Sequence, residues 1–265
     1  MNIKIVPKEV LKYTFRIVVF FAIMHTIAFF MNAFFPGAIA RKMSSAFNLD
    51  YEQNLPALFS FLQFWVVAIV LGLIAYWEFR AKSKSFRYWS TLSIIFIYLG
   101  IDELLEIHEI LVRLMSKYGH FTGVLHYSWI IPVGILVAIV GLFFLRFVLQ
   151  LPIRTRNGFI LSGLVFVASA IGGDVISGYL WSIYGDFPNI LTAIENVMEE
   201  GFEMLSIAYF LYSLLNYYHD FINEPVNLTV SKYRNLDDSH EEFDSANNFE
   251  KILLEKQSYR TGTFD

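Results

Sequence analysis

The sequence predicts an all-α integral membrane protein, a bundle of six transmembrane helices with a short polar C-terminal tail. Three observations predict this class: 56% of the 265 residues are hydrophobic, only 17% are charged, and the mean hydropathy is +0.50. A soluble domain carries about a quarter charged residues, and this chain would expose large apolar patches if it folded in water. A soluble enzyme is therefore excluded, as is a disordered chain outside the polar C-terminus.

Six apolar stretches are each long enough to cross a bilayer, which takes about 20 residues. They are expected as helices over residues 13–35, 57–79, 88–112, 128–149, 158–183 and 190–217. Helix-breaking residues lie between them, such as Pro36 after the first stretch and Pro152 before the fifth. The transmembrane domain is thus predicted over residues 1–217, followed by an acidic, largely flexible tail over residues 218–265.

The distribution of basic residues predicts the orientation of this bundle. Lysine and arginine concentrate before the first stretch, between the second and third, and between the fourth and fifth. Because cytoplasmic loops carry the excess of Lys and Arg, both termini and the tail are predicted to be cytoplasmic. The expected location is the cell membrane, either the inner or the plasma membrane.

Composition also limits the chemistry and the partners. The chain has no cysteine, so thiolate metal sites, disulfides and cysteine nucleophiles are impossible. The formal net charge is −4 and no basic stripe is present, so no nucleic acid is expected to bind. The expected partners are membrane lipid and a lipid-like substrate.

The third, fifth and sixth stretches contain nine acidic residues and no lysine or arginine. These acids are Asp102, Glu103, Glu106, Glu109, Asp174, Glu195, Glu199, Glu200 and Glu203. An acid inside a membrane is costly unless it is protonated, paired or bound to a cation. We therefore expect these acids to share protons, to line a water-filled cavity, or to hold metal ions.

Helix geometry places several of these groups at one depth. At about 1.5 Å per residue, a layer roughly 13–15 Å from the non-cytoplasmic helix ends holds His25, Asp102, Asp174 and Glu199. One face of the third helix holds Asp102, Glu106 and Glu109, and a stripe on the sixth holds Glu195, Glu199 and Glu203. His108 points about 120° away from the first face, so it joins the cluster only if the helix is locally distorted.

The leading hypothesis is a metal-dependent membrane enzyme that acts on a lipid or other apolar substrate. Carboxylates with one or two imidazoles suit a divalent metal such as Fe, Zn or Mn. The candidate metal ligands are His25, Asp102, Glu106, Glu109, Asp174, Glu195, Glu199 and Glu203. Glu103 is the candidate general base, in either a hydrolase or a di-iron type of oxidoreductase. The sequence lacks the Glu-x-x-His motif of di-iron bundles, and His120 and His126 are further ligands or simply loop residues.

Two other function classes remain open. A proton- or cation-coupled transporter or channel would use the same acids as a relay, although the inner halves of the helices lack acids to continue the path. A structural or assembly subunit of a membrane complex would contain these polar groups only incidentally. The sequence favours the enzyme first and the transporter second.

Overall fold

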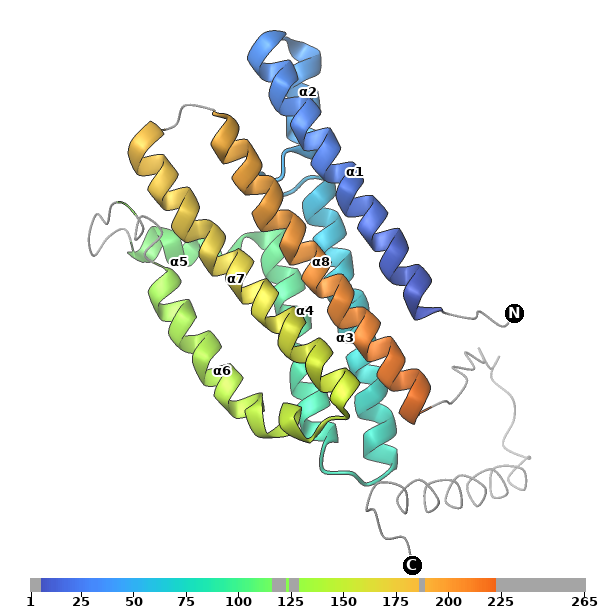
Figure 1. Ribbon diagram of the computed structural model, residues 1–265. Helices are drawn as coiled ribbons and strands as arrows, with labels where there is room; N and C mark the ends of the chain where they lie inside the picture. The colour runs from blue at the N-terminus through green and yellow to red at the C-terminus, as the bar shows by residue number, and fades with distance from the viewer. Residues whose placement is uncertain (1–5, 116–122, 124–128, 186–188, 223–265) are drawn as a thin grey trace, which may run out of the picture.

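The computed structural model describes residues 6–115, 123, 129–185 and 189–222. The secondary-structure elements in these ranges are α-helices (Figure 1). In chain order they are α1 (Pro7–Phe34), α2 (Ala38–Phe47), α3 (Leu55–Arg80), α4 (Phe86–Leu105), α5 (Ile107–Met115), α6 (Ile130–Gln150), α7 (Ile153–Tyr184) and α8 (Ile190–Phe221).

Within the described ranges, five helices are long and apolar enough to cross a membrane: α1, α3, α4, α6 and α7. Large apolar side chains point outward from them, and Ile94, Leu142 and Leu164 are each at least 65% exposed. Such a surface is unfavourable in water but suits hydrocarbon, where helices satisfy their own backbone hydrogen bonds. The expected class, a helical membrane protein, is confirmed.

Helix α8 carries the largest number of acids and lies in the interior of the arrangement. It packs against α7, α1 and α3 (Figure 1), while α3 also packs against α4, and α6 packs against α7. Neighbouring helices therefore shelter the polar side chains of α8 from lipid, where each would be costly.

The hydrophobic core lies at one end of the bundle and is built on aromatic rings. Trp89 is fully buried, and its ring centroid lies 5.1 Å from that of Phe147, 5.8 Å from Phe159 and 5.0 Å from Tyr217. These residues come from the start of α4, the end of α6, the start of α7 and the end of α8. This end of the bundle is closed mainly by apolar packing, whereas the acids singled out in the sequence lie toward the other end.

The start of α1 and the end of α8 lie at the same end of the bundle, together with the α3–α4 and α6–α7 connections (Figure 1). Most helix bounds agree with the predicted stretches to within a few residues. Two features differ from the expectation: the amphipathic helix α2 lies between the first two long helices, and the helix expected over residues 88–112 is divided into α4 and α5 at Glu106.

Candidate functional site

The break between α4 and α5 is held by a contact with a distant segment. Glu106 has φ 53° and ψ 42°, the left-handed conformation, which costs a residue with a side chain about 1–2 kcal/mol. Gln53, in the connection before α3, also has a positive φ of 59°. Its side-chain amide donates a hydrogen bond of 2.8 Å to Glu106 Oε1. This contact joins the two left-handed residues and stabilises the break.

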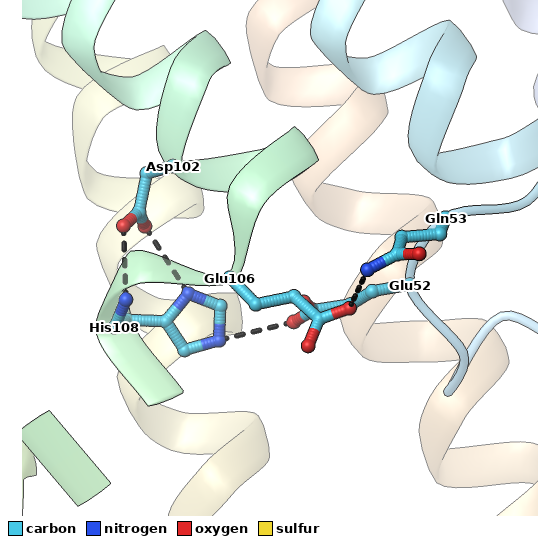
Figure 2. Close-up of polar contacts among 5 residues, drawn as sticks. All are labelled: Glu52, Gln53, Asp102, Glu106 and His108. Atoms are coloured by element: carbon cyan, nitrogen blue, oxygen red, sulfur yellow. Dashed lines mark hydrogen bonds and ion pairs between the residues drawn. The ribbon is translucent and has the colours of Figure 1, made fainter. Parts of the chain in front are cut away.

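The break brings His108 between two carboxylates (Figure 2). Its backbone amide donates to Asp102 Oδ1 at 3.0 Å and its Nδ1 lies 3.2 Å from Asp102 Oδ2. Its Nε2 lies 3.1 Å from Glu52 Oε1, on the connection before α3. The local helix distortion that His108 needs in order to join the acids is therefore present. We call Glu52, His108 and Asp102 the His108 bridge.

The two carboxylates determine the charge of this imidazole. Hydrogen bonds to Asp102 and then to Glu52 raise the pKa of His108 to about 10, although partial burial opposes this shift. His108 lies on α5, outside the candidate membrane spans. At neutral pH it is therefore an imidazolium held between two carboxyl groups.

On α8, Glu199 lies directly against the backbone of α7. A Cβ atom added at Gly173 would lie only 2.6 Å from Glu199 Cγ, so this approach requires glycine. The next residue on α7, Asp174, is close enough to interact electrostatically with Glu199 and with Glu203. The sequence-predicted acids of α7 and α8 thus meet at one place.

A second pair of acids lies one turn away on α8. The carboxyl groups of Glu195 and Glu199 lie close enough to interact with each other. With the side-chain amide of Asn196 oriented so that oxygen and nitrogen both find partners, its nitrogen donates to Glu195 Oε2 at 2.9 Å and to the carbonyl of Thr192 at 3.1 Å. Two carboxyl groups form a hydrogen bond only when one of them carries a proton, so this pair is suited to sharing one.

The contribution of α4 to the acids of α8 is Glu103. Its carboxyl group interacts electrostatically with those of Glu200 and Glu203, and Ser60 of α3 lies within hydrogen-bonding reach of it. The face expected to carry Asp102, Glu106 and Glu109 together does not form, because the helix ends at Leu105. We use the term acid cluster for Glu103, Asp174, Glu195, Glu199, Glu200 and Glu203.

The remaining predicted ligands lie elsewhere. His25 is buried and its Nδ1 accepts a hydrogen bond of 3.0 Å from the backbone amide of Leu49, which ties α1 to the connection after α2. The side chain of Glu109, and His120 and His126, lie outside the described residues. Among the side chains that the structure describes, no three His, Asp or Glu residues are grouped so as to hold a metal ion.

Several buried polar atoms near the acid cluster have no hydrogen-bond partner within the described part of the chain. They are Glu52 Oε2, Gln63 Oε1 and Glu195 Oε1. The amide nitrogen of Gln63, on α3, donates to the carbonyl of Met204 on α8 at 3.1 Å. Met204 directly follows Glu203 in the sequence. Buried polar atoms of this kind are normally satisfied by ordered water or by a protonated neighbour.

Two functional features are missed by the sequence reasoning. Glu52 and Gln53 lie in a short polar run before α3, and no motif in that run indicates their contacts with α4 and α5. At the opposite end of the bundle, Glu78 of α3 is 5% exposed and accepts hydrogen bonds from Ser85 Oγ (2.6 Å) and Tyr217 Oη (3.1 Å). An acid at the end of an apolar stretch does not indicate by itself which residues donate hydrogen bonds to it.

Comparison with known proteins assigns the family. Residues 17–217 match the model of a domain of unknown function, DUF8692. The chain belongs to the DUF8692 family. The match includes the His108 bridge and the acid cluster, so both lie within the family domain. No curated protein and no solved structure matches the chain.

Proposed function

We propose that this protein is a proton-coupled membrane transporter whose acid cluster takes up and releases protons. The observation that carries the proposal is the His108 bridge, an imidazole held between two carboxylates beside acids from α4, α7 and α8. Acids, histidines and water form proton relays within membranes.

The side chains of the His108 bridge are more exposed than that of Glu195. Glu52 and His108 are 29% and 31% exposed, Asp102 is 18% exposed, and Glu195 is 7% exposed. Protons from the aqueous side would reach the bridge first and the buried carboxyl pair last. Ordered water at the unpartnered polar atoms near the cluster would complete this path.

The opposite end of the bundle argues against an open channel. Leu71, Ile74, Trp89 and Leu214 are fully buried there and fill the space between the helices with apolar side chains. A proton cannot cross such packing without a polar chain, so crossing would need a conformational change. This arrangement fits a carrier that moves protons through a conformational change rather than an open channel.

We also propose that α8 is a sixth span and that both termini are cytoplasmic. The excess of basic residues before α1, in the α3–α4 connection and in the α6–α7 connection supports this orientation. Reporter fusions after Gly37 and Gly185 should report the outside, and fusions after Ser83 and Asn223 the inside. Opposite signals at two of these sites would contradict the proposed orientation.

The test of the transporter uses liposomes that contain purified, metal-free protein and a pH-sensitive dye. Under an imposed pH gradient, with potassium and valinomycin to remove the membrane potential, the protein should move protons faster than empty liposomes do. Glu199→Gln should abolish this flux, because the amide cannot carry the shared proton. Glu9→Gln is the matched control, since Glu9 is an exposed residue of α1 paired with Lys12, and it should leave the flux unchanged. No flux above empty liposomes, or an equal loss in both variants, would refute the proposal.

A metal-dependent enzyme is the second candidate. The observation in its favour is that the acid cluster and the His108 bridge together contain many acids and one imidazolium. A divalent Fe, Zn or Mn ion would offset the excess negative charge. Elemental analysis after gentle purification should then show metal that is lost in Asp102→Ala or Glu199→Ala. Protein that contains no metal and takes up no added divalent ion would exclude this candidate.

A further inference from the structure

We propose that a cavity between the start of α7 and the end of α8 binds the head group of a phospholipid that carries a phosphate and a primary ammonium. The cavity has a volume of about 360 Å³ and lies at the opposite end of the bundle from the acid cluster. Its polar lining comes from Arg154, Thr155 and Asn157 of α7 and from Tyr209, Tyr212 and Asp220 of α8. This site is independent of the proposed proton transport.

The cavity contains polar side chains that nothing in the described part of the chain satisfies. Thr155 is only 4% exposed, yet its hydroxyl group forms no hydrogen bond within the described residues. The guanidinium group of Arg154 likewise forms no hydrogen bond or ion pair there. Thr155 and Arg154 both line the cavity, so the hydroxyl group and the guanidinium group are available there to a ligand with acceptor atoms.

The backbone at this point adds donors of the same kind. Helix α7 begins at Ile153, and its N-cap residue, Pro152, provides no side-chain hydrogen bond to the first turn. The first amide groups of a helix and its dipole favour an anion. Together with the fork of donors on Arg154, they are suited to the oxygens of a phosphate group.

The other lining residues indicate a lipid rather than free phosphate. Ile153 is 59% exposed and lines the cavity together with Phe221, so apolar surface adjoins the donors. The rings of Tyr209 and Tyr212 stack with their centroids 5.9 Å apart, and tyrosine is typical of the membrane interface. The cavity lies where α6 ends and α7 begins, the level expected for head groups.

Asp220 selects among phospholipids. It lines the cavity and accepts a hydrogen bond from His219 Nδ1 through Oδ1, at 3.0 Å. Its second carboxylate oxygen is a suitable acceptor for a primary ammonium group with N–H donors. A quaternary choline group has no such donors, and a glycerol head group has no positive charge. Phosphatidylethanolamine chemistry therefore complements both Arg154 and Asp220.

The experiment titrates the full-length protein in detergent with dihexanoyl phosphatidylethanolamine, and native mass spectrometry counts the bound lipid. One molecule should bind saturably and more tightly than dihexanoyl phosphatidylcholine. Arg154→Ala should weaken binding of both lipids about tenfold or more, because a hydrogen bond to a charged group is lost. Asp220→Asn should remove only the preference for the ethanolamine head group. Arg146→Ala, which removes an exposed charge from α6 outside the cavity, is the matched control and should have no effect.

Thr155→Val provides a second variant that tests the site without loss of charge. It keeps the shape of the side chain, and the hydroxyl group it removes has no hydrogen-bond partner among the described residues. Folding should therefore be unchanged, and lipid affinity should fall several-fold. The proposal is overturned if no saturable binding occurs, if Arg146→Ala weakens binding as much as Arg154→Ala does, or if inorganic phosphate displaces the lipid at equal concentration. The last result would identify a free-phosphate site instead.

Discussion

Replacement of Gly158 by alanine tests how closely α7 and α8 are packed. A Cβ atom at this position would lie 2.7 Å from Ser213 Cβ on α8, whereas carbon atoms in contact are normally about 3.5–4.0 Å apart. The atom in the way is attached directly to the backbone of α8, so a change of rotamer cannot move it. Helix α7 would have to move away from α8 by about 1 Å, or the two helices would have to separate locally.

A second glycine in the same helix allows the magnitude to be worked out. At Gly163 an added Cβ meets no atom within 4 Å, so Gly163→Ala should stabilise the protein by about 0.5–1 kcal/mol through lower backbone entropy in the unfolded state. Gly158→Ala has the same gain but adds overpacking, which costs about 1–3 kcal/mol. The entropy term cancels between the variants, and Gly158→Ala should be less stable than Gly163→Ala by about 1–3 kcal/mol.

The free energy of unfolding would be measured in mixed micelles with increasing SDS, with tryptophan fluorescence as the signal. A rescue variant gives the decisive control, because Gly158→Ala combined with Ser213→Gly removes the Ser213 side chain that the added Cβ would collide with. The double-mutant cycle should show a favourable coupling of about 1 kcal/mol or more. Equal stability of the two alanine variants, or a coupling of zero, would refute the close packing of α7 and α8 at this point.

Three further outcomes follow from the site and the core. Gly173→Ala should displace the carboxyl group of Glu199 and reduce proton flux in liposomes. Gly172→Ala should leave the flux unchanged, because its Cβ would meet no atom within 4 Å. Equal flux in the two variants would contradict the contact between Gly173 and Glu199. The pKa of His108 in the folded protein is raised from 6.5 to about 10, so its contribution to stability is fully present below pH 6.5 and is lost as pH rises to 10. His108→Gln should therefore flatten the dependence of the unfolding free energy on pH across that window. Trp89→Ala should cost about 3–5 kcal/mol in the same unfolding assay, and a smaller loss than about 1 kcal/mol would show that the ring is not in the core.

The acids of α8 could be predicted from the sequence because a carboxyl group within an apolar stretch is unusual in itself. Glu199 and Glu203 lie on one helical stripe by their spacing alone, and the structure brings Asp174 to both. Spacing failed on α4, where a regular helix would have carried Asp102 and Glu106 on one face. The conformation of Glu106 depends on Gln53, which lies 53 positions earlier in the chain, and no local pattern contains that information.

The sequence by itself determined that this is a helical membrane protein and where its long helices lie. It also determined that acids without matching cations lie among these helices. Both results follow because hydropathy and helical period are properties of the chain alone. Tertiary structure decided which acids meet. Glu103 reaches the acids of α8 while Asp102 binds His108, and Glu52 enters from a connection that no periodicity marks. The physical reason is that hydrogen bonds and charge interactions act over a few ångströms in space, whatever the separation along the chain.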